Sequence, residues 1–162
     1  MLQTPQDLRK VYKAAKGLGD KLLMSDAICV PEGYGDLFLL FKEFPTPVLT
    51  VGEAAEVAMP FGMGAFQPSQ IKTHQQAQFS LAETVKGNIR KFLSDVAANG
   101  GYFNCRIYEG SQDKYAHCYY LEDCLLQADP VGRDTESRAQ VLYIAGTMFY
   151  HYFGTQDKQG NM

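Results

Sequence analysis

The alternation of apolar and polar residues predicts a chain built mainly from β-strands. Residues 75–81 alternate strictly, with Ala77, Phe79 and Leu81 on one face and uncharged polar residues on the other. Three further strand-like segments follow in the C-terminal third, at residues 102–109, 115–126 and 139–153. The last segment is apolar on both sides, which is typical of a strand that is covered on both faces.

Two segments have the spacing of amphipathic helices. Thr4 and Pro5 begin the first, whose apolar stripe ends before Gly17. We therefore expect an N-terminal helical arm within residues 1–19. Residues 81–99 predict a second and longer helix, because a Ser80-Leu81-Ala82-Glu83 capping box precedes apolar residues at helical spacing. We expect its apolar stripe to cover one face or one opening of a sheet.

Two segments between these helices lack helical periodicity. Residues 21–30 and 37–44 are strand-like and flank a turn with Pro31 and Gly33, so we expect a hairpin. Residues 51–72 are rich in glycine and proline and predict a long loop tipped with large apolar side chains, which are Met59, Phe61, Met63 and Phe66. A loop of this length is usually functional, and an apolar tip favours docking on a partner over packing on the chain's own surface.

Composition indicates one folded domain spanning residues 1–162. The apolar share of 46% excludes an intrinsically disordered chain, and a net charge of −3 argues against a surface that binds nucleic acid. No apolar run approaches bilayer length and the N-terminus has no signal-like pattern, so we expect cytoplasmic synthesis and no membrane binding. We expect residues 155–162 to form a flexible tail.

Residue types that carry chemistry are scattered. The sequence has no phosphate-binding loop and no nucleophile motif, and its histidines, His74, His117 and His151, lie far apart. Adjacent Glu122 and Asp123 point to opposite faces of a strand. We therefore expect no catalytic residue, no metal and no cofactor. The cysteines, which we expect to be buried thiols although disulfides remain open, are Cys29, Cys105, Cys118 and Cys124.

The order of these elements and several phrases resemble the tail tube proteins of contractile phage tails, which are related to tailocin and type VI secretion tubes. The clearest phrases are FNCRIYEG, YYLEDCLLQADP and ESRAQVLYIAGTMFYHYFG in the closing strands. The resemblance covers residues 21–154 and implies an α+β fold, an antiparallel β-sandwich or barrel flanked by one main helix. It further implies hexameric rings that stack into a virion tube for DNA delivery.

The resemblance also implies partners and site residues. Residues 51–72 would be the stacking and inter-subunit loop, with sheath outside the tube, tape measure protein and DNA in its lumen, and baseplate and neck proteins at its ends. The uncharged polar face formed by Gln76, Gln78 and Ser80 is a candidate for the lumen wall, and an ordinary solvated face is the alternative. We also keep open a tube-like initiator or terminator, and a small β-barrel that binds a hydrophobic ligand.

Overall fold

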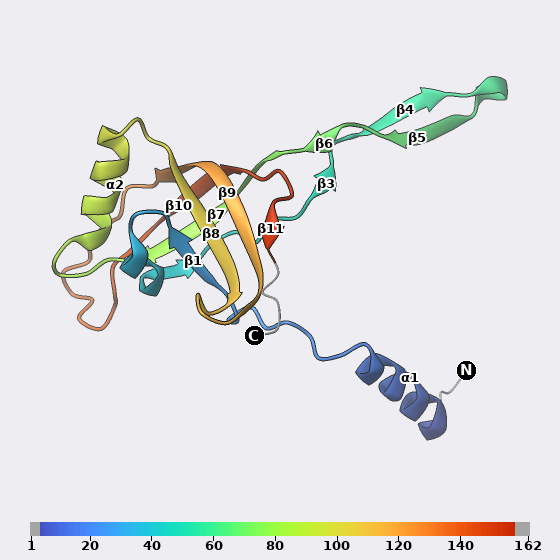
Figure 1. Cartoon of the computed structure of the whole chain (residues 1–162), viewed down its shortest axis with the longest axis horizontal. Coiled ribbons are helices and arrows are strands. Elements are labelled where there is room, and N and C mark those ends of the chain that lie inside the picture. Colours follow the sequence, from blue (N-terminus) through green and yellow to red (C-terminus); the bar gives the residue numbers. More distant parts are fainter. Residues whose placement is uncertain (1–3, 158–162) are drawn as a thin grey trace.

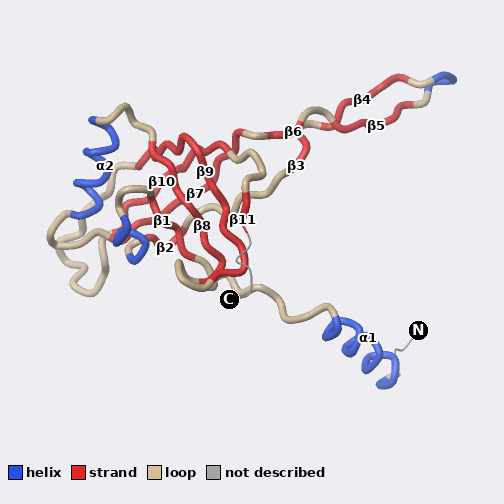
Figure 2. The backbone as a smooth tube through the Cα atoms, viewed as in Figure 1, coloured by secondary structure: helices blue, strands red, loops and turns tan. Residues whose placement is uncertain are grey.

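The computed structural model describes residues 4–157, in which a strand-rich body carries two projecting extensions (Figure 1). Its helices are α1 (Pro5–Gly17), η1 (Gly35–Leu39), η2 (Pro60–Gly62) and α2 (Asn88–Ala98), of which η1 and η2 are 3₁₀ turns. Its strands are β1 (Ile28–Pro31), β2 (Phe41–Glu43), β3 (Thr50–Val51), β4 (Ala54–Ala58), β5 (Gly64–Pro68), β6 (Ile71–Lys72), β7 (His74–Ala82), β8 (Phe103–Gly110), β9 (Tyr115–Ala128), β10 (Tyr143–His151) and β11 (Gln156–Asp157). The strand-rich body and the two extensions stand out in Figure 2.

The body is an antiparallel sheet with the strand order β1-β8-β9-β10-β7-β2, and β11 pairs with β9. The long strand β9 serves both halves of this sheet, because Tyr119 pairs with Ile107 of β8 and Leu126 pairs with Met148 of β10. Asp123 has a left-handed φ of 47° at the irregularity between these two registers. The predicted α+β class is confirmed, and in residues 4–157 the sheet is not closed into a barrel.

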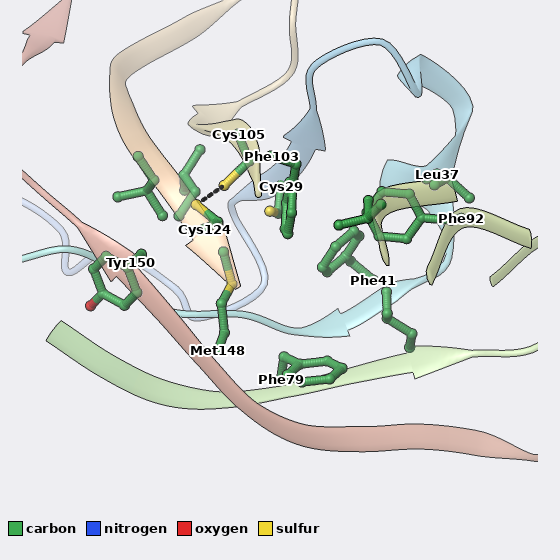
Figure 3. Packing of buried hydrophobic residues seen from close by; sticks show 14 of the residues in the cluster. Cys29, Leu37, Phe41, Phe79, Phe92, Phe103, Cys105, Cys124, Met148 and Tyr150 are labelled. Carbon is green, nitrogen blue, oxygen red and sulfur yellow. Dashed lines mark hydrogen bonds between the residues drawn. The ribbon is translucent and has the colours of Figure 1, made fainter. Parts of the chain in front are cut away.

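The core lies between the two halves of the sheet (Figure 3). Alternate residues of β7, including Phe79 and Leu81, are buried against Met148 of β10. The four cysteines are free and buried, as the sequence predicted. The Sγ atoms of Cys105 and Cys124 lie 3.8 Å apart, and this contact, with that of Cys29 and burial, raises the pKa of the Cys105 thiol well above its usual value.

Helix α2 packs against one end of the body. Ile89, Phe92 and Val96 are buried, and the ring of Phe92 makes edge contacts with Tyr34 at 4.8 Å and Phe103 at 5.4 Å between centroids. The helix is shorter than the predicted residues 81–99, because β7 continues to Ala82 before the chain turns.

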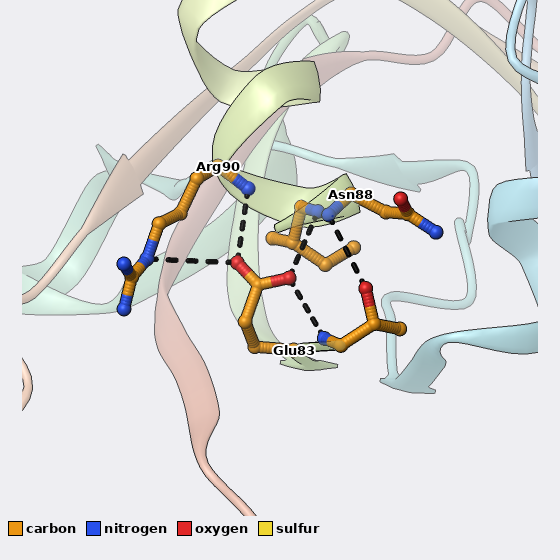
Figure 4. A network of polar contacts seen from close by, with 5 residues as sticks. Glu83, Asn88 and Arg90 are labelled. Atoms are coloured by element: carbon orange, nitrogen blue, oxygen red, sulfur yellow. Dashed lines mark hydrogen bonds and ion pairs between the residues drawn. The ribbon is translucent and has the colours of Figure 1, made fainter. Parts of the chain in front are cut away.

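The N-terminus of α2 is held by a single carboxylate (Figure 4). Glu83 accepts hydrogen bonds from the backbone N–H groups of Thr84 at 2.8 Å, Ile89 at 3.1 Å and Arg90 at 3.1 Å. The guanidinium Nε of Arg90 lies 3.7 Å from the same side chain, which is only 5% exposed. The expected Ser80 capping box is wrong, because Ser80 lies inside β7 and Glu83 reaches forward to the helix.

The predicted hairpin over residues 21–44 is also wrong. β1 pairs with β8 and β2 pairs with β7, so these two strands lie at opposite ends of the sheet order with η1 between them in sequence. The last predicted strand begins at Tyr143 instead of residue 139. In the expected C-terminal tail, Gln156 and Asp157 form β11 on β9, and residues 158–162 lie outside the described residues.

Helix α1 forms one of the two extensions. Thr4 accepts a hydrogen bond from the N–H of Asp7, and the Asp7 carboxylate accepts one from the N–H of Thr4, so the helix begins with a complete capping box. None of its residues is buried. Among the described residues, no helix has both the length and the apolar character needed to cross a membrane.

Candidate assembly interface

The segment at residues 51–72 forms the second extension, a two-stranded arm in place of the predicted irregular loop. β4 pairs with β5 along its length, from Ala54 opposite Pro68 to Ala58 opposite Gly64. β3 pairs with β6 at the base of the arm. The N–H of Met59 donates to the carbonyl of Met63 at 2.7 Å and closes the turn. The paired backbone makes this arm a defined projection of the body (Figure 1).

Three of the four predicted tip residues, Met59, Phe61 and Met63, lie at the turn that ends this arm, and Phe66 lies within β5, opposite Glu56 of β4. Their exposed fractions are 45% for Met59, 103% for Phe61, 65% for Met63 and 78% for Phe66. Four large apolar side chains exposed to water along one arm are unfavourable by about 25 cal/mol per Å² of apolar surface relative to burial. A group of this kind on a projecting arm is typical of a surface that becomes buried against a partner.

The backbone of the tip is also unusual. Phe61 has φ 63° and ψ 27°, a left-handed conformation that costs a bulky residue about 1–2 kcal/mol. Gly62 follows with φ 74°, so two consecutive left-handed residues turn the chain at the end of the arm, where the Phe61 side chain is fully exposed. Strain of this kind concentrates at functional positions.

The predicted polar residues Gln76, Gln78 and Ser80 lie on β7, on the face opposite Phe79 and Leu81. Gln76 and Gln78 are exposed, and Ser80 is half-buried. The structure therefore brings the three residues together on one face of the sheet, directly after the arm in sequence.

Sequence reasoning missed the neighbours of this polar face. Thr147 of β10 pairs with Gln78 and, on its other side, with Gln127 of β9, which gives a row of uncharged polar residues across three strands. The alternating pattern of β10 could be seen in the sequence, but the strands that pair with it could not. At the β2 edge, Glu43 lies opposite Ser80, so charge appears where this face ends.

One polar cluster outside these surfaces links β8 and β9. Nδ1 of His117 lies 3.1 Å from Oε2 of Glu109, and the hydroxyl of Tyr119 donates to Oε1 at 2.9 Å. Burial, followed by the Glu109 carboxylate, raises the pKa of Tyr119 to about 12. Both carboxylate oxygens are engaged by groups of the same sheet, which is the arrangement of a structural contact.

The histidines, the other residues with candidate chemistry, do not lie together at one site. His74 and His151 pair in register across β7 and β10, whereas His117 lies in the cluster with Glu109. In residues 4–157, no group of three or more His, Cys, Asp or Glu side chains is placed to hold a metal ion. The surfaces that stand out are therefore the arm tip and the uncharged sheet face.

Comparison with known proteins identifies the fold. No protein-family model and no curated protein matches this sequence. Solved structures do match: the sheath-tube complex of the extracellular contractile injection system PVC in its extended state has a TM-score of 0.64 at 7% identity, over 90% of this chain and 97% of that chain.

Two more of these structures occupy other positions in such assemblies. The PVC sheath/tube terminator has a TM-score of 0.63 at 7% identity, over 86% of this chain and 99% of that chain. The terminating cap of the anti-feeding prophage tube has a TM-score of 0.58 at 8% identity, over 86% of this chain and 93% of that chain. The fold of this chain is therefore shared with components of contractile injection systems, among them a sheath-tube complex, a sheath/tube terminator and a tube terminating cap.

Proposed function

We propose that this chain is a non-catalytic structural subunit that forms hexameric rings, and that the rings stack into the inner tube of a contractile phage tail. The observation that carries the proposal is the apolar arm tip, exposed on a fold shared with tube, terminator and cap components. The tube would deliver DNA, as the sequence resemblance implies, and the protein would reside in the virion.

The arm tip would make the contact between subunits. Met59, Phe61 and Met63 lie at the turn of the β4–β5 arm and Phe66 lies along β5, and all four are exposed, so a neighbouring subunit can surround them. Buried aromatic anchors commonly supply most of the affinity of an interface, because they remove large apolar areas from water at one place. Ring closure and stacking would bury the tip, which explains why a soluble subunit carries it.

The uncharged face of the sheet would line the lumen. Gln76, Gln78 and Ser80, joined by Thr147 and Gln127, offer neutral polar groups with no cluster of cations that would retain phosphate. DNA would pass such a wall without a strong binding site. Sheath would lie outside the tube, tape measure protein would share the lumen, and baseplate and neck proteins would contact the ends.

A terminator, cap or baseplate role is the second candidate, because two of the matched structures are a terminator and a cap and a third is a baseplate. Such a subunit would form one ring and bind tube on one face only, so indefinite polymerisation separates the two roles. The core side chains that fill the space between the sheet halves disfavour a barrel that binds a hydrophobic ligand (Figure 3).

The test of the arm is the triple variant F61S/M63S/F66S. We expect an unchanged thermal unfolding transition, because the three side chains are exposed, and at least about a tenfold rise in the concentration needed for assembly. Sedimentation velocity measures the assembly. The matched control is M24S/Y102S/V131S, which removes three exposed apolar side chains elsewhere. Unfolding of the tip variant, or assembly equal to wild type, would contradict the proposed role.

A further inference from the structure

Helix α1 has an apolar stripe that its own chain does not cover. Leu8, Val11 and Tyr12 share one side of the helix and remain 53%, 64% and 63% exposed. At 3.6 residues per turn, Arg9 and Lys16 border this stripe on the Tyr12 side. The full capping box at Thr4 indicates a helix that is formed before it binds, which reduces the entropy lost on docking.

Charge is divided unevenly between this arm and the rest of the protein. Residues 1–21 contain five basic residues and two acidic ones, whereas the remaining residues contain ten basic and 16 acidic ones. The N-terminal segment is therefore positive and the body negative. Opposite charges of this kind attract two copies of one chain and favour contact of the helix of one copy with the body of another.

The body offers a groove of matching character between η1 and α2. The groove has a volume of about 420 Å³, and its apolar lining consists of the partly exposed Tyr34 together with Leu37 and Phe92, which are largely buried in the core behind it. Asp36 and Asp95 supply carboxylates to the same lining, in which Lys91 is the one cation among its described residues. An apolar lining with an acidic border is complementary to a helix whose apolar stripe has a basic border.

The two surfaces lie on different sides of the molecule. Figure 1 shows α1 and the β4–β5 arm projecting on the side away from α2, which forms the opposite end of the body. A head-to-tail contact that repeats from copy to copy needs its two complementary surfaces on different faces of the subunit. Residues 18–27 connect α1 to β1 and can extend by at most about 35 Å, which lets the helix reach a neighbour.

We propose that α1 of one copy docks in the η1–α2 groove of a second copy of this chain. Leu8, Val11 and Tyr12 contact the apolar lining, and Arg9 and Lys16 face Asp36 and Asp95. This contact is separate from the arm-tip contact. It rests on the proposed function only because the second copy is the neighbouring subunit of the proposed assembly. It assigns the N-terminal helix to self-association.

A charge exchange in the full-length protein tests the contact by sedimentation velocity. R9E/K16E and D36K/D95K should each raise the concentration for half-maximal association about tenfold, because each replaces attraction by repulsion. A variant with all four substitutions should return this concentration to within about threefold of wild type, because the two reversed charges attract again. If the substitutions had instead unfolded the helix or damaged the groove, combining them would not restore association. K114E/R138E is the control for net charge, since both side chains are exposed elsewhere on the body.

Each outcome separates this proposal from the tube role. R9E/K16E protein that associates like wild type, or a combined variant without recovery, would overturn the docking proposal while wild-type tubes still supported the tube. Wild-type dimers that are lost in R9E/K16E and recovered in the combined variant would support docking and contradict the tube. A monomer at every concentration would overturn both. Binding of α1 to vesicles of phosphatidylserine and phosphatidylcholine, lost in R9E/K16E with self-association unchanged, would assign the helix to a membrane surface instead.

Discussion

Glu83 connects the sheet to helix α2 through one side chain. Its carboxylate accepts three backbone N–H groups near the helix start, where Gly87 supplies no side-chain cap. We expect Glu83→Ala to lower the free energy of unfolding by about 1–3 kcal/mol, because three backbone donors, two of them in partly buried hydrogen bonds, lose a charged acceptor. Urea denaturation measures the change. Glu56→Ala on the exposed arm is the control, and equal losses in the two variants would contradict the capping role.

The buried cysteines should be unreactive in the folded protein. Contact with Cys124 and Cys29, together with burial, raises the pKa of Cys105, so its thiol stays protonated at pH values where an exposed cysteine ionises. We expect iodoacetamide to label none of the four thiols rapidly in the native state and all four in concentrated guanidinium, as counted by mass spectrometry. Native labelling at the rate of the unfolded chain would show that the thiols are accessible.

At the scale of the elements, the pairing of β9 with β10 depends on the absence of a side chain at Gly146. A Cβ atom there would lie 2.0 Å from the carbonyl oxygen of Gln127 and 2.9 Å from the Cα of Ala128. We expect Gly146→Ala to lower the free energy of unfolding by about 1–3 kcal/mol, because the two backbones must separate.

Gly132→Ala is the matched control for this prediction, because nothing lies within 4 Å of the corresponding Cβ position. Urea denaturation of both variants compares the effects directly. If Gly146→Ala were as stable as Gly132→Ala, the claim that β10 and β9 approach too closely at Gly146 to admit a side chain would be contradicted.

Elements with strong local patterns were predictable from the sequence. The capping residues of α1, the alternation of β7 and the aromatic segments of β8 and β9 each determine an element through neighbours in sequence. β1 and β2 were mispaired because each joins a strand far away in sequence, which no local pattern reports. The β4–β5 arm was mistaken for a loop because alanine and glycine have low strand propensity.

The candidate site was predictable in part for the same reason. The apolar tip residues stood out because four large side chains interrupt a glycine- and proline-rich segment. Thr147 and Gln127 joined the polar face only through the register of three strands, and the η1–α2 groove combines residues about 55 positions apart. Pairing and packing over long sequence distances therefore supplied what the sequence alone did not.

At the scale of the whole molecule, the protein is a strand-rich body with two extensions and helix α2 at its opposite end (Figure 1). The arm tip and α1 both present apolar side chains that the described body does not cover. A subunit with projecting contact surfaces on one side can add copies in one direction, which produces closed rings or continuous stacks. This shape is the physical basis for the assembly that we propose.

Negative-stain electron microscopy of the purified, untagged protein over a range of concentrations tests this central claim most directly. We predict rings at low concentration and hollow tubes of uniform width at high concentration, because each added subunit buries an arm tip and offers a new one. Single rings that never elongate would instead favour the terminator or cap role. A monodisperse monomer at every concentration would contradict the account.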